Sequence, residues 1–475
     1  KLAEIYNNYN VEQQESIHQI LREQFQMNDA LYILSFLVKY LNLDAFWEDI
    51  IWHVCRENKD CFLGSMVEAQ LEIYGTALYK QKRMLHRKNV QNFMQALNLP
   101  DGRSREQEKN KKRIVIVAEQ LLSIKHAPTL ITLEFAYILQ EKMNYEVCII
   151  TCPLDYHLPF DLWVDPRYYY GGFEGVRDIP YKGVKIRNIG FSMEDGSLDR
   201  CSRMLHMIAA WKPWLVLELG VTNPLADLCR EFTVTVAMAM TTECPVSEAD
   251  ILIRYVPGTG AYEEACKKEL LPRQKQIFMQ EKLPVIAQEA EKECVPDELG
   301  LPEGKFFVAV VGNRLDLEID EAFLNIMKQI MDAAENVDFA VIGDAEKLQE
   351  KLADTSYGKR IHFLGYCMDL PGTYRALHLY LNPRRLGGGW SSAMALMAGL
   401  PVVTLPACDV AYNVGGEFTV TTEEEMVDAV IRYASDDVFY AQKKQIAIEK
   451  GRDGGEQKML EYVTSLFTRI QENVE

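Results

Sequence analysis

The densest group of residues that could bind an anion is the run NPRRLGGGWSS, at positions 382–392. Glycines let backbone N–H groups approach a ligand closely, and arginines form charge-assisted hydrogen bonds with phosphate oxygens. Serines at the start of a helix can cap that helix or bind phosphate oxygens. The run therefore predicts a phosphate-binding turn. Its candidate residues are Arg384, Arg385, Gly387, Gly388, Gly389, Trp390, Ser391 and Ser392.

The segments around this run predict a strand, a turn, a helix and a second strand. Leu379–Leu381 is a short apolar strand, a helix rich in Ala and Met ends at Gly399, and Leu400–Leu405 is a buried strand. The positive end of the helix dipole then points at the glycines. One of the two arginines is expected to bind phosphate and the other to form a salt bridge. The alternative is an ordinary βαβ unit whose glycine turn only packs tightly.

Strands and helices alternate from Lys305 onward, which predicts a parallel α/β domain. Its expected strands include Phe306–Val311, Val337–Gly343, Arg360–Leu364 and Glu417–Val420. Open α/β sheets bind ligands beyond the carboxyl ends of their strands. Further candidates for ligand binding therefore lie at or beyond the ends of strands, namely Asn313, Arg314, Phe363, Leu364, Gly365, Tyr366 and Asp409.

An earlier region, which begins at Arg113, alternates in the same way. Two candidate catalytic residues follow its strands: His126 after Ile114–Ala118, and Glu243 after Thr233–Met238. His126 precedes a helix entrance and could accept a proton or contact an acceptor, or it could only satisfy the loop backbone. A charged helix over Tyr262–Glu293 is expected to end this region.

Residues 1–100 contain almost no strand signal, and their apolar residues recur at helical spacing. The fold class predicted for the whole chain is therefore α/β, with two Rossmann-like, doubly wound domains preceded by an all-α domain. The expected boundaries are 1–108 for the helical domain, 109–298 for the N-terminal α/β domain and 299–475 for the C-terminal one.

Composition narrows the function classes. The net charge of −18 argues against a nucleic-acid-binding protein, because phosphate contacts need a basic surface. Apolar runs stay well below the ~20 residues of a membrane span, and the visible start shows no signal peptide. The 11 cysteines are scattered, which is typical of reduced thiols in a cytoplasmic protein. Metal-ligand spacing is absent from the sequence, so neither a metal nor a cofactor is predicted.

Two tandem doubly wound domains with a phosphate turn in the second resemble the GT-B fold of glycosyltransferases. The stretch Asn382–Leu405 is similar to the O-linked N-acetylglucosamine transferase group, although Trp390 replaces a histidine and Ala395 replaces an aspartate. The glutamates of retaining families are replaced by Leu386 and Met394, which weakly favours inversion. The preceding helices resemble those of bacterial adhesin glycosyltransferases.

The resemblance implies an enzyme that moves a sugar from a nucleotide-sugar donor, with UDP as the expected nucleotide, to a protein or glycan acceptor without a metal. It also implies that the C-terminal domain binds the donor and that the helical domain recognises an acceptor or partner. Two alternatives stay open. One is a non-catalytic GT-B-like subunit of a glycosyltransferase complex, and the other is a UDP-sugar 2-epimerase.

Overall fold

A computed structural model describes most of the chain in two compact units. The first unit contains residues 1–280 together with 463–475, and the second contains residues 281–462. The description omits residues 42, 75–78, 101–108, 119–120, 124–125, 155–170, 193–196, 221–222, 241–242, 255–260, 280–282, 287–291, 368, 386, 407, 453 and 475.

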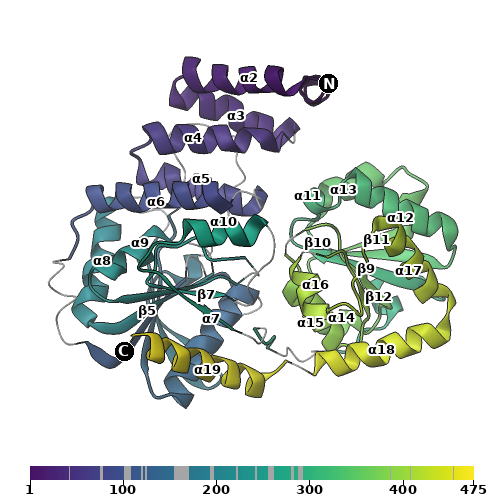
Figure 1. The fold of residues 1–475 in the computed structure, drawn as a ribbon. Coiled ribbons are helices and arrows are strands. Elements are labelled where there is room, and N and C mark those ends of the chain that lie inside the picture. The colour runs from purple at the N-terminus through teal and green to yellow at the C-terminus, as the bar shows by residue number, and fades with distance from the viewer. Residues whose placement is uncertain are drawn as a thin grey trace. The chain divides into compact units, whose positions relative to one another are not determined.

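The first hundred residues are helical, as their periodicity predicts (Figure 1). Asn10 caps the second helix in a capping box with Gln13, which satisfies two backbone N–H groups. Apolar residues from the first five helices and Leu85 share one core. The helices are α1 Leu2–Asn7, α2 Val11–Gln24, α3 Met27–Leu41, α4 Trp47–Glu57, α5 Cys61–Tyr74 and α6 Tyr79–Ala96.

The sheet of the first unit has the strand order β3-β4-β2-β1-β5-β6-β7-β8. Its strands pair in parallel except β3 and β4, which form an antiparallel hairpin. Helices α7 Ala127–Tyr137, α8 Leu198–Trp211, α9 Pro224–Leu228 and α10 Ala261–Glu269 belong to the same unit. The strands are β1 Asn110–Ala118, β2 Glu146–Thr151, β3 Gly175–Tyr181, β4 Val184–Gly190, β5 Pro213–Leu219, β6 Val234–Met238, β7 Ile251–Arg254 and β8 Lys275–Phe278.

The end of this sheet differs from the sequence prediction. The expected helix Tyr262–Glu293 is wrong, because α10 ends at Glu269 and a strand, β8, follows. Pro272 lies in the intervening turn, and proline interrupts a helix because it lacks a backbone N–H. Strand β8 then pairs in parallel with β7.

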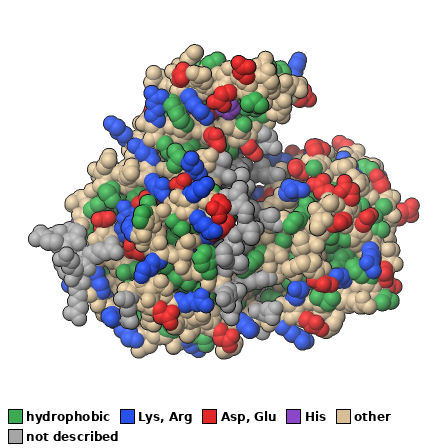
Figure 2. Space-filling view, viewed as in Figure 1, with side chains coloured by type: hydrophobic (Ala, Val, Ile, Leu, Met, Phe, Trp, Pro, Cys, Tyr) green, Lys and Arg blue, Asp and Glu red, His purple; other side chains and the backbone are tan. Residues whose placement is uncertain are grey.

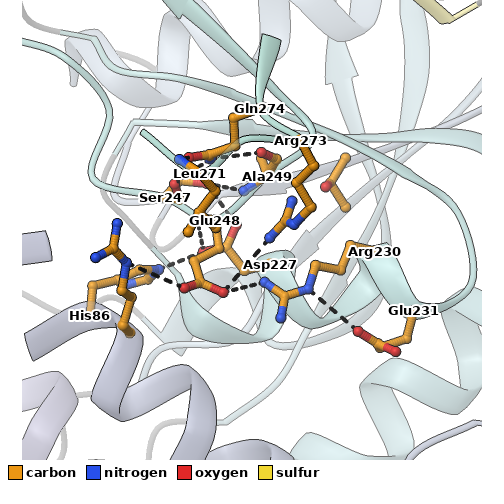
Figure 3. A network of polar contacts seen from close by, with 12 residues as sticks. His86, Asp227, Arg230, Glu231, Ser247, Glu248, Ala249, Leu271, Arg273 and Gln274 are labelled. Carbon is orange, nitrogen blue, oxygen red and sulfur yellow. Dashed lines mark hydrogen bonds and ion pairs between the residues drawn. The ribbon is translucent and has the colours of Figure 1, made fainter. Parts of the chain in front are cut away.

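Buried polar side chains tie the helices to this sheet. In α6, His86 Nε2 lies 2.5 Å from Asp227 Oδ2 of α9, and His86 Nδ1 lies 2.9 Å from Glu68 Oε1 of α5. Burial alone would lower the pKa of His86, but Glu68 and Asp227 raise it to about 10. His86 is therefore protonated at neutral pH and forms an internal ion network (Figure 3).

Helices α5 and α6 also share an apolar core with the strands. Phe62, Val90 and Phe93 pack in one cluster with Val115 and Val117 of β1. The boundary that the sequence predicts near residue 108 separates helices from strands. It does not separate the compact units, and its functional meaning stays a prediction.

The second unit has a five-stranded sheet in the order β11-β10-β9-β12-β13, and each described pair is parallel. Separate apolar clusters cover its two faces. The strands are β9 Phe306–Gly312, β10 Val337–Gly343, β11 Ile361–Gly365, β12 Leu379–Leu381 and β13 Val402–Val403. The helices are α11 Leu315–Glu318, α12 Glu321–Ala333, α13 Glu346–Leu352, α14 Leu370–Tyr374, α15 Gly389–Met397, α16 Asp409–Val414, α17 Glu423–Ser435 and α18 Asp437–Gly451.

The doubly wound α/β architecture is thus confirmed in both units, with smaller differences at the end of the second sheet. The strand expected over Leu400–Leu405 is shorter, and the expected strand Glu417–Val420 contributes only an isolated bridge between Thr404 and Thr419. Helix α19, Glu456–Val474, ends in the first unit, where Arg469 donates a 2.7 Å hydrogen bond to the carbonyl oxygen of Phe278.

The described surface is mixed in charge. On the face drawn in Figure 2, basic and acidic side chains are interspersed, and acidic ones are frequent over α12 and α13. None of the helices in the described part of the chain combines the length with the apolar character that crossing a membrane requires.

Candidate functional site

The glycine-rich turn lies where the sequence places it, between β12 and α15. Strand β12 pairs with β9 on one side and β13 on the other, so the turn leaves the carboxyl end of an interior strand. Gly388 has a φ of 93°, a left-handed conformation that favours glycine, and it is the N-cap of α15. The first N–H groups of a helix lack intrahelical partners, so the start of α15 can donate hydrogen bonds to an anion.

Helix α16 borders the same turn. Asn413 donates a 2.7 Å hydrogen bond from Nδ2 to the carbonyl oxygen of Gly389. A Cβ atom at Gly389 would lie 3.1 Å from Cβ of Asp409 and 2.9 Å from Asn413 Nδ2. The structure therefore brings Asp409, predicted from its position after a strand, next to the glycines.

Arg385 lies beneath the turn and points inward. Its side chain is 6% exposed and forms an ion pair with Glu318 of α11. Arg385 Nη2 donates to the carbonyl oxygen of Val311 at 2.6 Å and to the hydroxyl of Tyr380 at 2.8 Å, and Nε donates to Asn382 Oδ1 at 2.9 Å. Burial alone would lower the pKa of Arg385, but Tyr380 and Glu318 raise it. Of the predicted pair, Arg385 forms the buried salt bridge, whereas Arg384 contacts its carboxylate partner, Glu423, at the surface.

The other two arginines are more accessible. Arg314 follows β9, its side chain is 44% exposed, and Nη2 lies 3.4 Å from Glu318 Oε1. The same Nη2 lies 4.0 Å from the position of a Cβ at Gly387, so this cation borders the turn. Arg384 is 75% exposed and contacts Glu423 at 3.3 Å.

The two serines differ in their surroundings. Ser391 donates from Oγ to the carbonyl oxygen of Gly388 at 3.0 Å, and its Oγ also lies 3.1 Å from the hydroxyl of Tyr380. Ser392 is fully buried and donates to the carbonyl oxygen of Gly389 at 2.8 Å. The expected phosphate contact of the Ser392 hydroxyl does not fit this geometry, because its hydrogen is engaged inside the helix.

Trp390 occupies the first turn of α15 and packs against the apolar cluster below it. Its indole Nε1 is buried and has no hydrogen-bond partner among the described residues. The side chain therefore contributes packing to the helix start.

The end of β11 carries the residues predicted to contact the nucleotide base. Phe363 and Leu364 are partly buried and pack on opposite apolar clusters of the sheet. Gly365 has a φ of 64°, and a Cβ at this position would meet no atom within 4 Å. Tyr366 is 63% exposed. Together with the exposed Asn313 after β9, these residues lie beyond the carboxyl ends of strands in the same sheet as the turn.

The two candidate catalytic residues of the first unit follow strands that are not neighbours. His126 is the N-cap of α7, and its Nδ1 lies 3.1 Å from Thr129 Oγ1. Burial lowers the pKa of His126 to about 4, so the imidazole is neutral at pH 7. Glu243 is 27% exposed and lies 3.5 Å from Lys82 Nζ of α6. Strand β5 separates β1 from β6, and the catalytic roles of both residues stay predictions.

Several residues that shape the turn were missed by sequence reasoning. Tyr380 lies in an apolar run, so the sequence predicts only a strand residue there. Glu318 and Asn413 are distant in sequence from the glycines that they support. Among these supporting residues, Asn382 could have been expected from the sequence, because it directly follows strand β12. The described residues contain no group of three or more His, Cys, Asp or Glu side chains that could hold a metal ion.

Comparisons with known proteins bear on this site. Residues 307–436, which include the glycine turn, match the family model described as Glycosyl transferases group 1. A comparison with curated protein sequences finds no match for the chain.

Solved structures of low sequence identity share the fold. A mutant O-GlcNAc transferase of Thermobaculum terrenum superposes with a TM-score of 0.59 at 15% identity, covering 95% of this chain and 89% of that one. A glycosyltransferase from Rickettsia africae has a TM-score of 0.52 at 11% identity, covering 77% and 100%. Anabaena HepE in complex with UDP and glucose has a TM-score of 0.51 at 12% identity, covering 76% and 99%. The chain therefore has the GT-B fold of glycosyltransferases, with a Glycosyl transferases group 1 domain over residues 307–436.

Proposed function

We propose that this chain is a glycosyltransferase that moves a sugar from a UDP-linked donor to a protein or glycan acceptor, without a metal ion and with inversion at the sugar. The observation that carries the proposal is the turn Gly387–Gly389. It combines a left-handed glycine, the N-terminus of a nine-residue helix and the adjacent cation Arg314. These are the groups that bind and neutralise a diphosphate.

In this proposal the diphosphate is a leaving group. Negative charge develops on it as the bond to the sugar breaks, and fixed backbone dipoles stabilise that charge without reorganising. Arg314 adds a mobile positive charge, and the end of β11 supports the base. Support for a UDP donor also comes from the Anabaena structure of similar fold, which contains UDP and glucose.

We assign His126 to the acceptor side. The neutral imidazole of His126 can accept a proton, as a general base must when it activates a hydroxyl group. The helices of residues 1–96 are proposed to recognise an acceptor or partner protein. An intracellular, cytoplasmic setting is consistent with cysteines that form no disulfide bonds in the structure.

One observation favours a second candidate, a non-catalytic subunit that stabilises a partner transferase. Each arginine near the turn has a carboxylate partner, namely Glu318 for Arg314 and Arg385, and Glu423 for Arg384. Such pairing reduces the positive potential available to a diphosphate. In a non-catalytic subunit, the turn would keep its fold, and the paired arginines would not bind a donor.

Calorimetric titration of the purified chain with UDP, with and without EDTA, tests the donor site. Metal-free binding is expected to give the same dissociation constant in both, and binding abolished by EDTA would refute it. Hydrolysis or transfer of UDP-sugars by the chain alone then separates the enzyme from the subunit. Isomerisation of the donor without an acceptor would instead identify an epimerase.

A further inference from the structure

We propose that Arg385 and Glu318 form a buried positioning pair that sets the shape of the phosphate-binding turn and presents Arg314 to the donor. The inference rests on the proposed donor site and assigns different roles to two arginines of that site. Arg314 contacts the diphosphate, whereas Arg385 acts through the turn and touches no ligand.

The hydrogen bonds of Arg385 leave it little capacity for a ligand. Four of the five N–H groups of its guanidinium are engaged, by Glu318, Asn382, Tyr380 and the carbonyl oxygen of Val311. The Arg385 side chain is only 6% exposed and that of Glu318 only 11%. Turning Arg385 toward a diphosphate would break these bonds and leave a buried carboxylate without its main partner, which is costly.

Two glycines make room for the pair. A Cβ at Gly388 would lie 2.7 Å from Arg385 Nη2. A Cβ at Gly312, at the end of β9, would lie within 3 Å of both Arg385 Nη1 and Glu318 Oε2. The left-handed glycine of the turn therefore rests directly on the guanidinium, and a change in the guanidinium position changes the turn.

A relay of hydrogen bonds connects the pair to the helix start. Arg385 donates to the Tyr380 hydroxyl, which lies 3.1 Å from Ser391 Oγ, and Ser391 donates to the carbonyl oxygen of Gly388. Tyr374 donates to the carbonyl oxygen of Ser391 at 3.0 Å. The relay fixes the first turn of α15, whose N–H groups are the proposed phosphate donors.

The second carboxylate oxygen of Glu318 explains the link to Arg314. Oε2 is held by Arg385 and Oε1 lies 3.4 Å from Arg314 Nη2. One carboxylate therefore anchors a buried arginine and guides an exposed one, and the exposed one borders Gly387. Neutralisation of Glu318 by Arg385 keeps this carboxylate from repelling the donor.

The test compares Arg385→Lys, Arg385→Met, the double variant Arg385→Met with Glu318→Met, and Arg360→Gln as a matched control. Arg360 is another partly buried arginine of this unit. It pairs with Asp338 at 3.2 Å and donates to the carbonyl oxygens of Met331 and Ala334, away from the turn. Melting temperature and the dissociation constant for UDP are measured for each, the latter well below the melting temperature.

A positioning role predicts that Arg385→Lys weakens UDP binding by about tenfold or more, because a lysine keeps the charge but cannot span the same acceptors. Arg385→Met is expected to lose both stability and UDP binding, and the double variant to recover most of both, since no buried carboxylate is left unpaired. Arg360→Gln should lower the melting temperature and leave UDP binding unchanged.

Two results would overturn the inference. Retained UDP affinity in Arg385→Lys would show that only the charge matters, and a stable double variant without UDP binding would show that Arg385 contacts the donor. If the double variant does not fold, Arg385→Lys still decides. A wild-type chain that binds no UDP would refute the donor site itself, while the stabilities of the single and double variants would still test the pair.

Discussion

Each unit of this chain contains an ion network beside a sheet of mostly parallel strands, and the two networks differ in what they support. In the first unit, His86 and Asp227 have fully buried side chains (Figure 3). In the second, the buried pair Arg385–Glu318 continues to Arg314, whose side chain is 44% exposed and borders a glycine turn. Similar residue types therefore join helices α5, α6 and α9 in one unit and support a glycine turn in the other.

The comparison shows that charge alone does not identify a binding site. In the first unit, the buried His86 is engaged by the carboxylates of Glu68 and Asp227. In the second unit, by contrast, the glycines at the N-terminus of α15 lie beside a partly exposed cation, Arg314. Breaking each network should therefore change a different quantity, stability in the first unit and ligand affinity in the second.

The largest expected effect is on folding. Asp227→Ala should lower the free energy of unfolding by about 3–5 kcal/mol, because it removes the buried carboxylate that pairs with His86 and accepts a hydrogen bond from Ser247. Affinity for UDP should not change at temperatures where the variant is folded. Denaturant unfolding and calorimetric titration measure the two quantities.

Glu461→Ala provides the control for that variant. Glu461 forms a 4.0 Å contact with Lys458 in which both side chains are more than half exposed, so its loss should cost less than about 1 kcal/mol. Equal losses for Asp227→Ala and Glu461→Ala would mean that the buried network contributes little to the stability of the first unit.

Stability should also depend on pH through His86. Its pKa is about 10 in the folded protein, against roughly 6.5 in an unfolded chain. The folded state therefore binds this proton more tightly. The stabilisation is complete below about pH 6.5 and is lost as the pH rises through about 10.

Comparison with His86→Leu isolates this contribution, since other titrating groups are common to both proteins. The difference in unfolding free energy between wild type and variant should shrink as the pH rises from about 6.5 to about 10. A difference that stays constant over this range would show that His86 does not carry a proton in the folded state.

In the second unit, Arg314→Ala should weaken UDP binding by roughly 1.5–3 kcal/mol, the range for hydrogen bonds with a charged partner. The melting temperature should change little, because the Arg314 side chain is 44% exposed and its one described ion pair is a 3.4 Å contact. An unchanged dissociation constant would make Arg314 a surface residue. Arg384→Ala, whose side chain is 75% exposed, separates a general charge effect from a specific one.

The two serines should give the smallest effects and should differ from each other. Ser392→Ala removes a buried hydrogen bond inside α15, so it should cost about 0.5–1.5 kcal/mol of stability and leave UDP binding unchanged. Ser391→Ala interrupts the relay to Gly388 and should weaken UDP binding. Thermal unfolding and titration of both variants measure this difference. Similar losses of UDP affinity would show that Ser392 also contributes to ligand binding.

The regular elements of this fold were largely predictable from sequence. Strands Val337–Gly343 and Leu379–Leu381 were predicted with the bounds that the structure has, because buried parallel strands appear as continuous apolar runs. Strand β8 was missed because it is short and lies at the sheet edge, with a partly polar pattern that favoured the wrong helix.

The candidate site was predictable only in part. Glycines and a helix start are local signals, so the turn itself was found. The inward direction of Arg385 and the buried hydroxyl of Ser392 depend on Glu318, Tyr380 and the packing of α15. Glu318 is 67 residues from Arg385, a separation that no local pattern encodes, and the roles of adjacent arginines or serines depend on such packing.

The most direct test of the central claim, that the turn binds a diphosphate, is UDP affinity and melting temperature in Gly387→Val. A Cβ at Gly387 would have Arg314 Nη2, at 4.0 Å, as its nearest neighbour, and the backbone there is not left-handed. We therefore expect the new side chain to fill ligand space beside Arg314 while the fold is kept. Gly416→Val, where a Cβ meets no atom within 4 Å, is the matched control.

The account predicts that Gly387→Val keeps the melting temperature of the wild type and loses UDP affinity by about tenfold or more, equivalent to about 1.4 kcal/mol. Gly416→Val should keep both. Wild-type UDP affinity in a stable Gly387→Val variant would contradict the claim and leave the turn as a packing feature of the sheet.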